Sequence, residues 1–255
     1  MIVFSNAKIN VGLAVLDKRE DGFHNLDSIF YPVPLCDIIE FNPAKKDSFT
    51  IYGIQISKTD NLIVKAVDLL RSHYSIPAVS IHLFKQIPLG AGLGGGSSNA
   101  THTLLALNKL FELNISNERL ADFALFLGSD CPFFFKNTSS FVTGRGESIV
   151  ETESFLKGKF IQLIYPEIHI STADAFNKLT KLSVSTTAET NWIHTTNDFQ
   201  KGVVSEYPII SELLDDLKKK GAIYTSMSGT GSCVYGIFNE MPNKLNKFQS
   251  WIFKL

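Results

Sequence analysis

The residues best suited to chemistry lie in a glycine-rich stretch from Pro88 to Ala100, which reads Pro-Leu-Gly-Ala-Gly-Leu-Gly-Gly-Gly-Ser-Ser-Asn-Ala. Five of its glycines fall within seven residues. Glycine has no Cβ atom and adopts positive φ angles, so several backbone N–H groups can approach one ligand. A helix predicted to start at about Ser98 adds unpaired N–H groups and the positive end of its dipole. The stretch therefore predicts an anion site, with phosphate as the anion.

The type of phosphate site is narrowed by what surrounds the glycines. Gly90, Gly92 and Gly95 satisfy the G-x-G-x-x-G pattern, but a dinucleotide-binding fold needs a strand after the helix that ends in an acidic residue. Glu112 follows the glycines at a distance suitable for this acidic residue, but no strand precedes it. A Walker loop requires Gly-Lys-Ser/Thr where this chain has Gly-Ser-Ser, and protein-kinase motifs are absent. A nicotinamide-dependent oxidoreductase, a non-catalytic nucleotide-binding module and a flexible connector remain as alternatives.

A second polar group stands on a strand predicted over residues 5–16. Apolar residues occupy every alternate position from Ala7 to Val15, so Lys8, Asn10 and Gly12 share the opposite face. Two polar side chains beside a small residue suit a surface that a ligand approaches closely. The structural alternatives are a lysine whose stem lies along apolar surface and a polar strand edge.

Other elements must position these groups. The predicted helices share an amphipathic spacing and span residues 61–74, 98–111, 116–127 and 207–220. Ser116 is the expected N-cap of the third, and Gly128 ends it just before Asp130. Further strands are predicted over 79–83 and 160–165, with a hairpin turn at 144–147 and strand-like runs to residue 55 that prolines interrupt. Residues 183–200 are polar and predict a loop.

Composition limits the class of protein. The chain has 255 residues, 44% hydrophobic and 19% charged, as expected of a soluble protein with one large domain or two modest ones. A net charge of −1 argues against a nucleic-acid partner. The three widely spaced cysteines predict reduced thiols. Without a signal-peptide pattern or a run of ~18 apolar residues, a cytoplasmic protein with no membrane partner is expected.

Three segments together resemble the GHMP family of small-molecule kinases. The stretch from Pro88 to Ala100 resembles the family's ATP loop, Ala7-Lys8-Ile9-Asn10 its N-terminal strand, and Ser228-Gly229-Thr230-Gly231-Ser232 its C-terminal glycine-rich motif. Two further segments, Asp21-Gly22-Phe23-His24 and Leu127-Gly128-Ser129-Asp130-Cys131-Pro132, follow the order found in members that act on a cytidine-diphosphate-linked alcohol. The resemblance spans nearly the whole chain.

The resemblance implies an α+β protein with the two-domain GHMP-kinase fold and a cleft between the domains. Residues 1–155 would form a ribosomal-protein-S5-like ATP domain, and residues 156–255 a ferredoxin-like domain. ATP and Mg²⁺ are the implied cofactors. The implied substrate is a cytidine-diphosphate-linked methylerythritol, phosphorylated on its 2-hydroxyl in non-mevalonate isoprenoid biosynthesis. A related kinase for homoserine, mevalonate or a sugar is the alternative, and neither metal ligands nor an oligomeric state is predicted.

The resemblance also implies roles for individual residues. Asp130 would be the catalytic base, and Lys8 would pair with it and stabilise charge on the γ-phosphate. The implied ATP contacts are Pro88, Leu89, Gly90, Ala91, Gly92, Leu93, Gly94, Gly95, Gly96, Ser97 and Ser98. The implied substrate contacts are Asn10, Phe23, His24, Thr172, Phe176, Gly229 and Gly231.

Within that substrate set, His24 would read the cytosine edge, and Phe23 and Phe176 would flank the ring. Four members of the set have a structural alternative: Phe176 as a core residue, Thr172 as a helix N-cap, and Gly229 and Gly231 as a tight turn. Phe23 stands where the family usually has Tyr, so the ring is kept and a hydroxyl is lost. Residues 183–200 also form a short stretch for the family.

Overall fold

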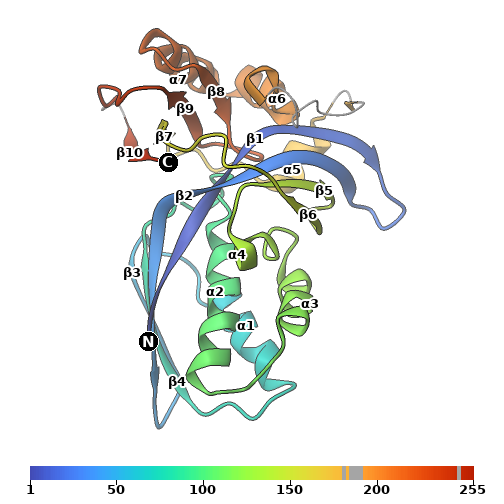
Figure 1. The fold of residues 1–255 in the computed structure, drawn as a ribbon, viewed down its shortest axis with the longest axis vertical. Coiled ribbons are helices and arrows are strands. Elements are labelled where there is room, and N and C mark those ends of the chain that lie inside the picture. Colours follow the sequence, from blue (N-terminus) through green and yellow to red (C-terminus); the bar gives the residue numbers. More distant parts are fainter. Residues whose placement is uncertain (180–181, 184–191, 246–247) are drawn as a thin grey trace. The chain divides into compact units, whose positions relative to one another are not determined.

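Two long strands begin the chain in a computed structural model that describes residues 1–179, 182–183, 192–245 and 248–255. They are β1 (Ile2–Lys18) and β2 (His24–Pro43), and β1 pairs with β2 (Figure 1). The first sheet has the strand order β3-β4-β2-β5-β6 besides β1. The alternation predicted for residues 5–16 is confirmed as strand, but both faces of β1 are buried from Ser5 to Val15.

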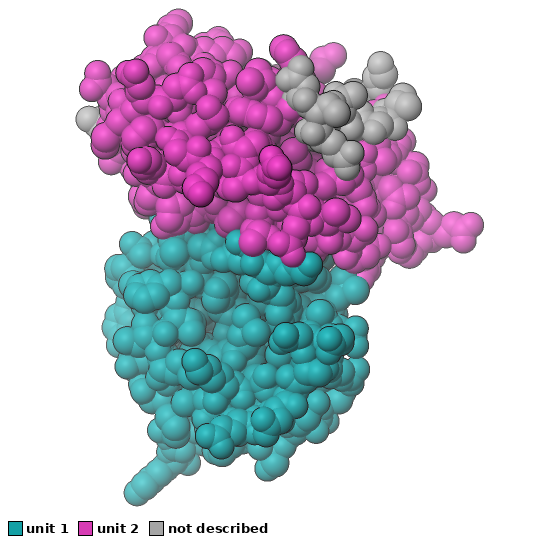
Figure 2. Space-filling model, in the orientation of Figure 1, with its two compact units in different colours: residues 1–7, 35–88, 94–137 teal, residues 8–34, 89–93, 138–255 magenta. Residues whose placement is uncertain are grey.

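The chain divides into two compact units, coloured separately in Figure 2. Unit 1 comprises residues 1–7, 35–88 and 94–137, and unit 2 comprises residues 8–34, 89–93 and 138–255. Each unit contains its own buried apolar cluster. The domain boundary predicted between residues 155 and 156 stays a prediction.

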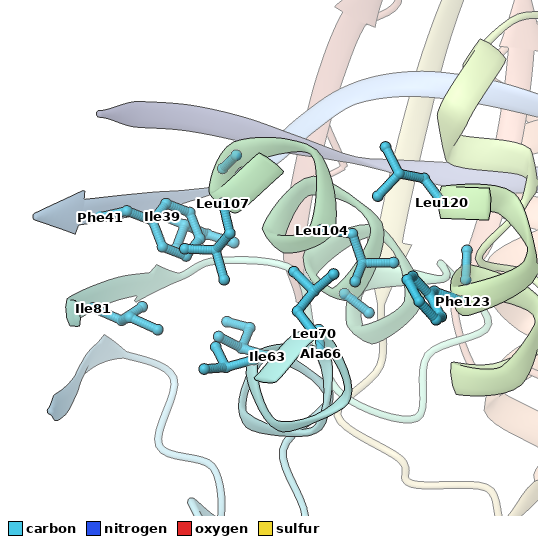
Figure 3. Close-up of a cluster of buried hydrophobic side chains, with 14 of the residues drawn as sticks. Ile39, Phe41, Ile63, Ala66, Leu70, Ile81, Leu104, Leu107, Leu120 and Phe123 are labelled. Atoms are coloured by element: carbon cyan, nitrogen blue, oxygen red, sulfur yellow. The ribbon is translucent and has the colours of Figure 1, made fainter. Parts of the chain in front are cut away.

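In unit 1, helices pack on one face of the sheet. The strands β3 (Ser48–Gly53) and β4 (Val79–Lys85) run parallel, and β4 pairs antiparallel with β2. The helices are α1 (Leu62–Arg71), α2 (Gly95–Leu110), α3 (Asn117–Leu127) and the short α4 (Phe133–Lys136). Figure 3 shows how side chains from the strands and from α1, α2 and α3 meet in the core. From α2 this core takes Ala100, Leu104, Ala106 and Leu107.

Helix boundaries in unit 1 follow their capping residues. Ser116 accepts a hydrogen bond from the backbone N–H of Arg119, and Gly128 is the C-cap of α3, as predicted. Asn61 caps α1 in the same way through Ile63. The face that α1 buries is Ile63, Ala66, Val67 and Leu70, and Leu62 and Leu69 are partly buried against the same core.

The prediction that prolines interrupt the second strand was wrong. Strand β2 runs through both Pro32 and Pro34. Its ladder with β5 ends at Phe30, and its ladder with β4 begins at Ile38. The prolines stand between the two ladders, so neither ladder loses an N–H donor.

Unit 2 holds a second sheet in the order β10-β7-β9-β8, antiparallel throughout. Its strands are β7 (Phe160–Tyr165), β8 (Tyr224–Met227), β9 (Val234–Phe238) and β10 (Gln249–Lys254). The helices are α5 (Thr172–Asn177), α6 (Asp198–Glu206) and α7 (Pro208–Lys219), with a 3₁₀ turn η1 (Trp192–His194). The predicted hairpin at 144–147 joins β5 (Ser140–Gly144) to β6 (Ser148–Glu151).

The loop predicted over residues 183–200 is only partly correct. Residues 184–191 lie outside the described residues, whereas η1 and the first turn of α6 are helical. Asn197 caps α6 by accepting a hydrogen bond from Phe199. Among the helices that the structure describes, none has the length and apolar character needed to cross a membrane.

Candidate active site

In unit 1 the glycine-rich stretch turns directly into α2. Gly94 is the N-cap residue with a φ of 68°, a left-handed conformation that favours glycine. The helix therefore begins at Gly95, three residues before the predicted start at Ser98. The first-turn N–H groups, those of Gly95, Gly96 and Ser97, have no carbonyl partner within the helix. This arrangement is suited to binding an anion.

Asp130 lies in a turn that packs against the same helix. The hydroxyl of Thr101 in α2 donates to the carbonyl oxygen of Cys131 at 2.8 Å. At Gly128 a Cβ atom would lie 3.8 Å from the Ser97 hydroxyl, so this turn approaches the first turn of α2 closely. Burial raises the pKa of the Cys131 thiol to about 12, so the thiol remains neutral beside the carboxylate. Unit 1 thus places the turn that carries Asp130 near the N-terminus of α2.

In unit 2 the first half of the glycine-rich stretch packs on the C-terminal glycine motif. The hydroxyl of Ser228 donates to the carbonyl oxygen of Gly92 at 2.7 Å. The N–H of Cys233 donates to the carbonyl oxygen of Ala91 at 3.2 Å. A Cβ atom on Gly92, whose φ is 73°, would overlap the carbonyl oxygen of Ser228. Only glycine fits here, because both the backbone angle and the space exclude a side chain.

The polar face predicted on β1 is confirmed as a connected, buried group in unit 2. Lys8 Nζ donates to Asn10 Oδ1 at 2.5 Å, and it lies 4.3 Å from the centre of the Phe30 ring. Asn10 Nδ2 donates to the hydroxyl of Ser28 at 2.9 Å. The side chains of Lys8 and Asn10 are almost completely buried. The contacts with Asn10 and Phe30 therefore orient the lysine amine.

Strand β1 is tied to the glycine-rich stretch by backbone contacts. The N–H of Lys8 donates to the carbonyl oxygen of Leu93 at 2.9 Å. The N–H of Asn10 donates to the hydroxyl of Ser228 at 3.2 Å, and Tyr235 donates to the Asn10 carbonyl oxygen at 2.6 Å. The structure therefore brings together Lys8, Asn10, the loop residues Gly92 and Leu93, and Gly229.

The predicted aromatic residues form two separate contacts in unit 2. His24 stacks on Phe176 with ring centres 4.8 Å apart and an interplanar angle of 26°. Phe23 is 49% exposed, and the Arg145 guanidinium lies 5.0 Å from its ring centre. The structure thus pairs His24 with Phe176 and places Phe23 beside Arg145.

Thr172 is the first residue of α5, and its predicted role as N-cap was wrong. Ser171 is the cap, because its hydroxyl accepts a hydrogen bond from the N–H of Asp174. The Thr172 hydroxyl lies 3.5 Å from that of Thr230. Gly229 and Gly231 lie in the turn between β8 and β9, so Thr172 faces the loop that carries both glycines.

Several residues of this site were not predicted as contacts. Ser28 and Ser228 supply hydroxyl links to β1, and Tyr235 anchors its backbone. Ser228 stands within the C-terminal glycine motif, so the sequence motif could have identified it as a site residue. Among the described residues, no group of three or more His, Cys, Asp or Glu side chains is arranged to hold a metal ion.

A cavity of about 830 Å³ in unit 2 lies among α5, α6 and α7. None of the described residues that line it is a predicted substrate contact. We therefore do not assign this cavity to the substrate.

This arrangement belongs to a known family. Residues 61–137 match the model of the GHMP kinases N-terminal domain, and residues 183–249 match that of the GHMP kinases C-terminal domain. The chain belongs to the GHMP kinase family. A 4-diphosphocytidyl-2-C-methyl-D-erythritol kinase from Azobacteroides pseudotrichonymphae is 42% identical, over 97% of each chain. The kinase of the same name from Caldanaerobacter subterraneus is 35% identical, over 95% of this chain and 89% of that one.

Solved structures agree with the fold. A crystal structure of 4-(cytidine 5'-diphospho)-2C-methyl-D-erythritol kinase has a TM-score of 0.81 at 28% identity, covering 93% of this chain and 90% of its own. The mevalonate kinase of Methanococcus jannaschii has a TM-score of 0.66 at 16% identity, covering 99% and 96%. The second likeness concerns the fold alone. The predicted α+β GHMP-kinase fold is confirmed; the structure builds it from two sheets.

Proposed function

We propose that this chain transfers the γ-phosphate of ATP to the 2-hydroxyl of 4-diphosphocytidyl-2-C-methyl-D-erythritol, a step in non-mevalonate isoprenoid biosynthesis. The observation that carries the proposal is 42% identity over 97% of the chain to a kinase named for this alcohol. The stacked His24 and Phe176 rings support a substrate that contains a pyrimidine base, because bases bind proteins through aromatic stacking.

The roles of the reacting groups follow from their chemistry. The carboxylate of Asp130 accepts the proton of the alcohol as its oxygen attacks the γ-phosphate. Phosphoryl transfer passes through a loose transition state, so the proton can leave late and an ordinary carboxylate suffices. Lys8, held by Asn10, stabilises the negative charge on the transferred group. The backbone N–H groups of Gly95, Gly96 and Ser97 bind the phosphates of ATP.

A magnesium ion fits this scheme. Mg²⁺ in kinases is bound chiefly by phosphate oxygens and water, with few protein ligands. The protein oxygen that we assign to it is the hydroxyl of Ser97, in the first turn of α2. When bound, the ion neutralises charge on the phosphates of ATP.

The test is ADP release in the presence of one alcohol at a time. The panel contains 4-diphosphocytidyl-2-C-methyl-D-erythritol, mevalonate, homoserine and galactose, each with ATP and Mg²⁺. We expect turnover with the cytidylyl alcohol and less than ~1% of that rate with the others, because each lost contact of 1.4 kcal/mol reduces specificity tenfold. Activity confined to another alcohol would contradict the proposed substrate, but it would still support an ATP-dependent kinase activity. ATP binding without any turnover would indicate a non-catalytic module.

A further inference from the structure

A buried ion pair stands in unit 1 immediately before the glycine-rich stretch. Lys85, the last residue of β4, pairs with Asp37 of β2, and the two side chains are 1% and 0% exposed. Both lie in the inward-facing row of their strands, among apolar neighbours such as Leu83 and Ile39. Burying two charges offers little net stability, because loss of hydration offsets their attraction. The location of the pair suggests a role beyond stability.

The Asp37 carboxylate binds the backbone that leads into the phosphate loop. Its Oδ1 atom accepts the N–H of Gln86 at 2.7 Å and the N–H of Ile87 at 2.9 Å. Its Oδ2 atom accepts a hydrogen bond from Lys85 Nζ. With both oxygens engaged, the carboxylate has one orientation. The direction in which the chain leaves β4 toward Pro88 is therefore set by this side chain.

The same pair is also connected to the helix that follows the loop. A Cβ atom on Gly95, the first residue of α2, would lie 3.0 Å from Lys85 Nζ. The hydroxyl of Ser5 lies 3.4 Å from the Asp37 carbonyl oxygen and donates to Asn99 Oδ1 in α2 at 2.6 Å. Burial lowers the pKa of Lys85, and the adjacent Asp37 carboxylate opposes that shift. The ion pair thus lies beside both ends of the loop, bonded to the backbone at Gln86 and Ile87 and in contact range of Gly95.

We infer that Asp37 is a positioning residue for the phosphate loop. Its carboxylate, oriented by Lys85, fixes the backbone at Gln86 and Ile87 and so directs the following N–H groups toward ATP. The atom that matters is the acceptor oxygen facing these two N–H groups, and the charge serves to hold it in place. The inference rests on the proposed function in one respect, namely that the ligand of the phosphate loop is ATP.

Two double variants separate the acceptor from the charge. Asp37→Leu with Lys85→Met removes both charges and the acceptor, in an apolar replacement that folded proteins commonly tolerate. Asp37→Asn with Lys85→Met also removes both charges, but the amide oxygen can still accept from Gln86 and Ile87. A thermal unfolding curve for each variant verifies that it folds.

Two measurements are made on each folded variant. The first is backbone amide hydrogen exchange of residues 86–98 without ligand, and the second is the Kd of a non-hydrolysable ATP analogue. For the Leu/Met variant we expect faster exchange and a Kd raised about tenfold to a hundredfold, the range seen when residues supporting a site are removed. For the Asn/Met variant we expect both values within about threefold of the parent chain, because a retained acceptor preserves the geometry. The KM for the alcohol should not change in either.

A matched control is Asp47, which binds the first residue of β4, at the opposite end of that strand from Lys85. Asp47 accepts the N–H of Val79 at 2.8 Å and pairs with Arg71 at 2.7 Å, so it too joins a backbone N–H to a cation. Asp47→Leu with Arg71→Met should leave ATP affinity unchanged. The inference is overturned if both test variants keep the parent exchange pattern, or if both lose it equally. A parent chain that binds no ATP refutes the proposed function, and hydrogen exchange still decides the positioning role.

Discussion

Asp130 is the residue on which the chemical proposal depends most directly. Its turn packs against α2 through the Thr101–Cys131 hydrogen bond, and that contact does not involve the carboxylate. Asp130→Asn should therefore leave the fold and ATP affinity nearly unchanged, while turnover falls by ~10²–10⁴ because the base is lost. Single-turnover kinetics with a separate ATP titration would measure the two effects.

The control for this substitution is Asp122→Asn. Asp122 lies on α3 in the same unit, where it is 70% exposed and pairs with Arg119. Its loss should change turnover by less than about twofold, since exposed ion pairs contribute little. If Asp130→Asn retains full turnover, another group removes the proton.

Some residues of the site could be predicted from the sequence and others could not. The polar face of Lys8 and Asn10 was predictable, because strand alternation fixes which side chains share a side. The pair of Asp37 and Lys85 was not predicted, although each stands in an apolar row of its strand. Their pairing depends on the register between β2 and β4, a contact between residues 48 positions apart. Local patterns contain no information about that register.

At the scale of elements, Gly92 tests the packing of the two glycine-rich motifs. Gly92→Ala would require a left-handed alanine, which costs about 1–2 kcal/mol, and would also push the Ser228 carbonyl away. We expect a loss of unfolding free energy greater than 2 kcal/mol and an ATP KM raised roughly tenfold, because a shift of 1.4 kcal/mol corresponds to that factor. Denaturant titration and steady-state kinetics measure these.

Gly158 provides the matched comparison for that substitution. Its φ is 82°, and a Cβ atom there would meet nothing within 4 Å. Gly158→Ala therefore introduces the same backbone strain without a clash, and we expect a loss of about 1 kcal/mol with an unchanged ATP KM. Equal effects of the two substitutions would show that the Gly92–Ser228 contact has no special importance.

The sequence predicted the presence of elements better than their details. Capping residues such as Ser116 and turn glycines such as Gly128 act within a few positions of the chain, so the limits of α3 were predictable. The start of α2 was placed three residues late, since a glycine run carries little helical signal and the turn at Gly94 depends on packing. The continuity of β2 through its prolines depends on which partner strands lie beside it.

For the whole molecule, the predicted fold came from a family resemblance and not from composition. The composition of this chain is that of many mixed α/β proteins. The two cores draw residues from segments far apart, such as Ile39 with Leu120 in unit 1 and Val15 with Leu217 in unit 2. Periodicity identifies the buried face of each segment but not the segment that covers it.

A ligand that binds only the folded chain raises the stability of the whole molecule. At a concentration of 100 Kd the gain is about 2.7 kcal/mol. For a chain of this size each kcal/mol raises the melting temperature by about 2–4 °C. We expect a non-hydrolysable ATP analogue to raise the Tm by at least about 5 °C in calorimetry.

Nicotinamide dinucleotide at the same concentration should leave the Tm unchanged. The predicted shift should also shrink in Gly92→Ala at the same analogue concentration, because a tenfold weaker Kd removes about 1.3 kcal/mol of the gain. Stabilisation by the dinucleotide in place of the ATP analogue would favour the oxidoreductase alternative.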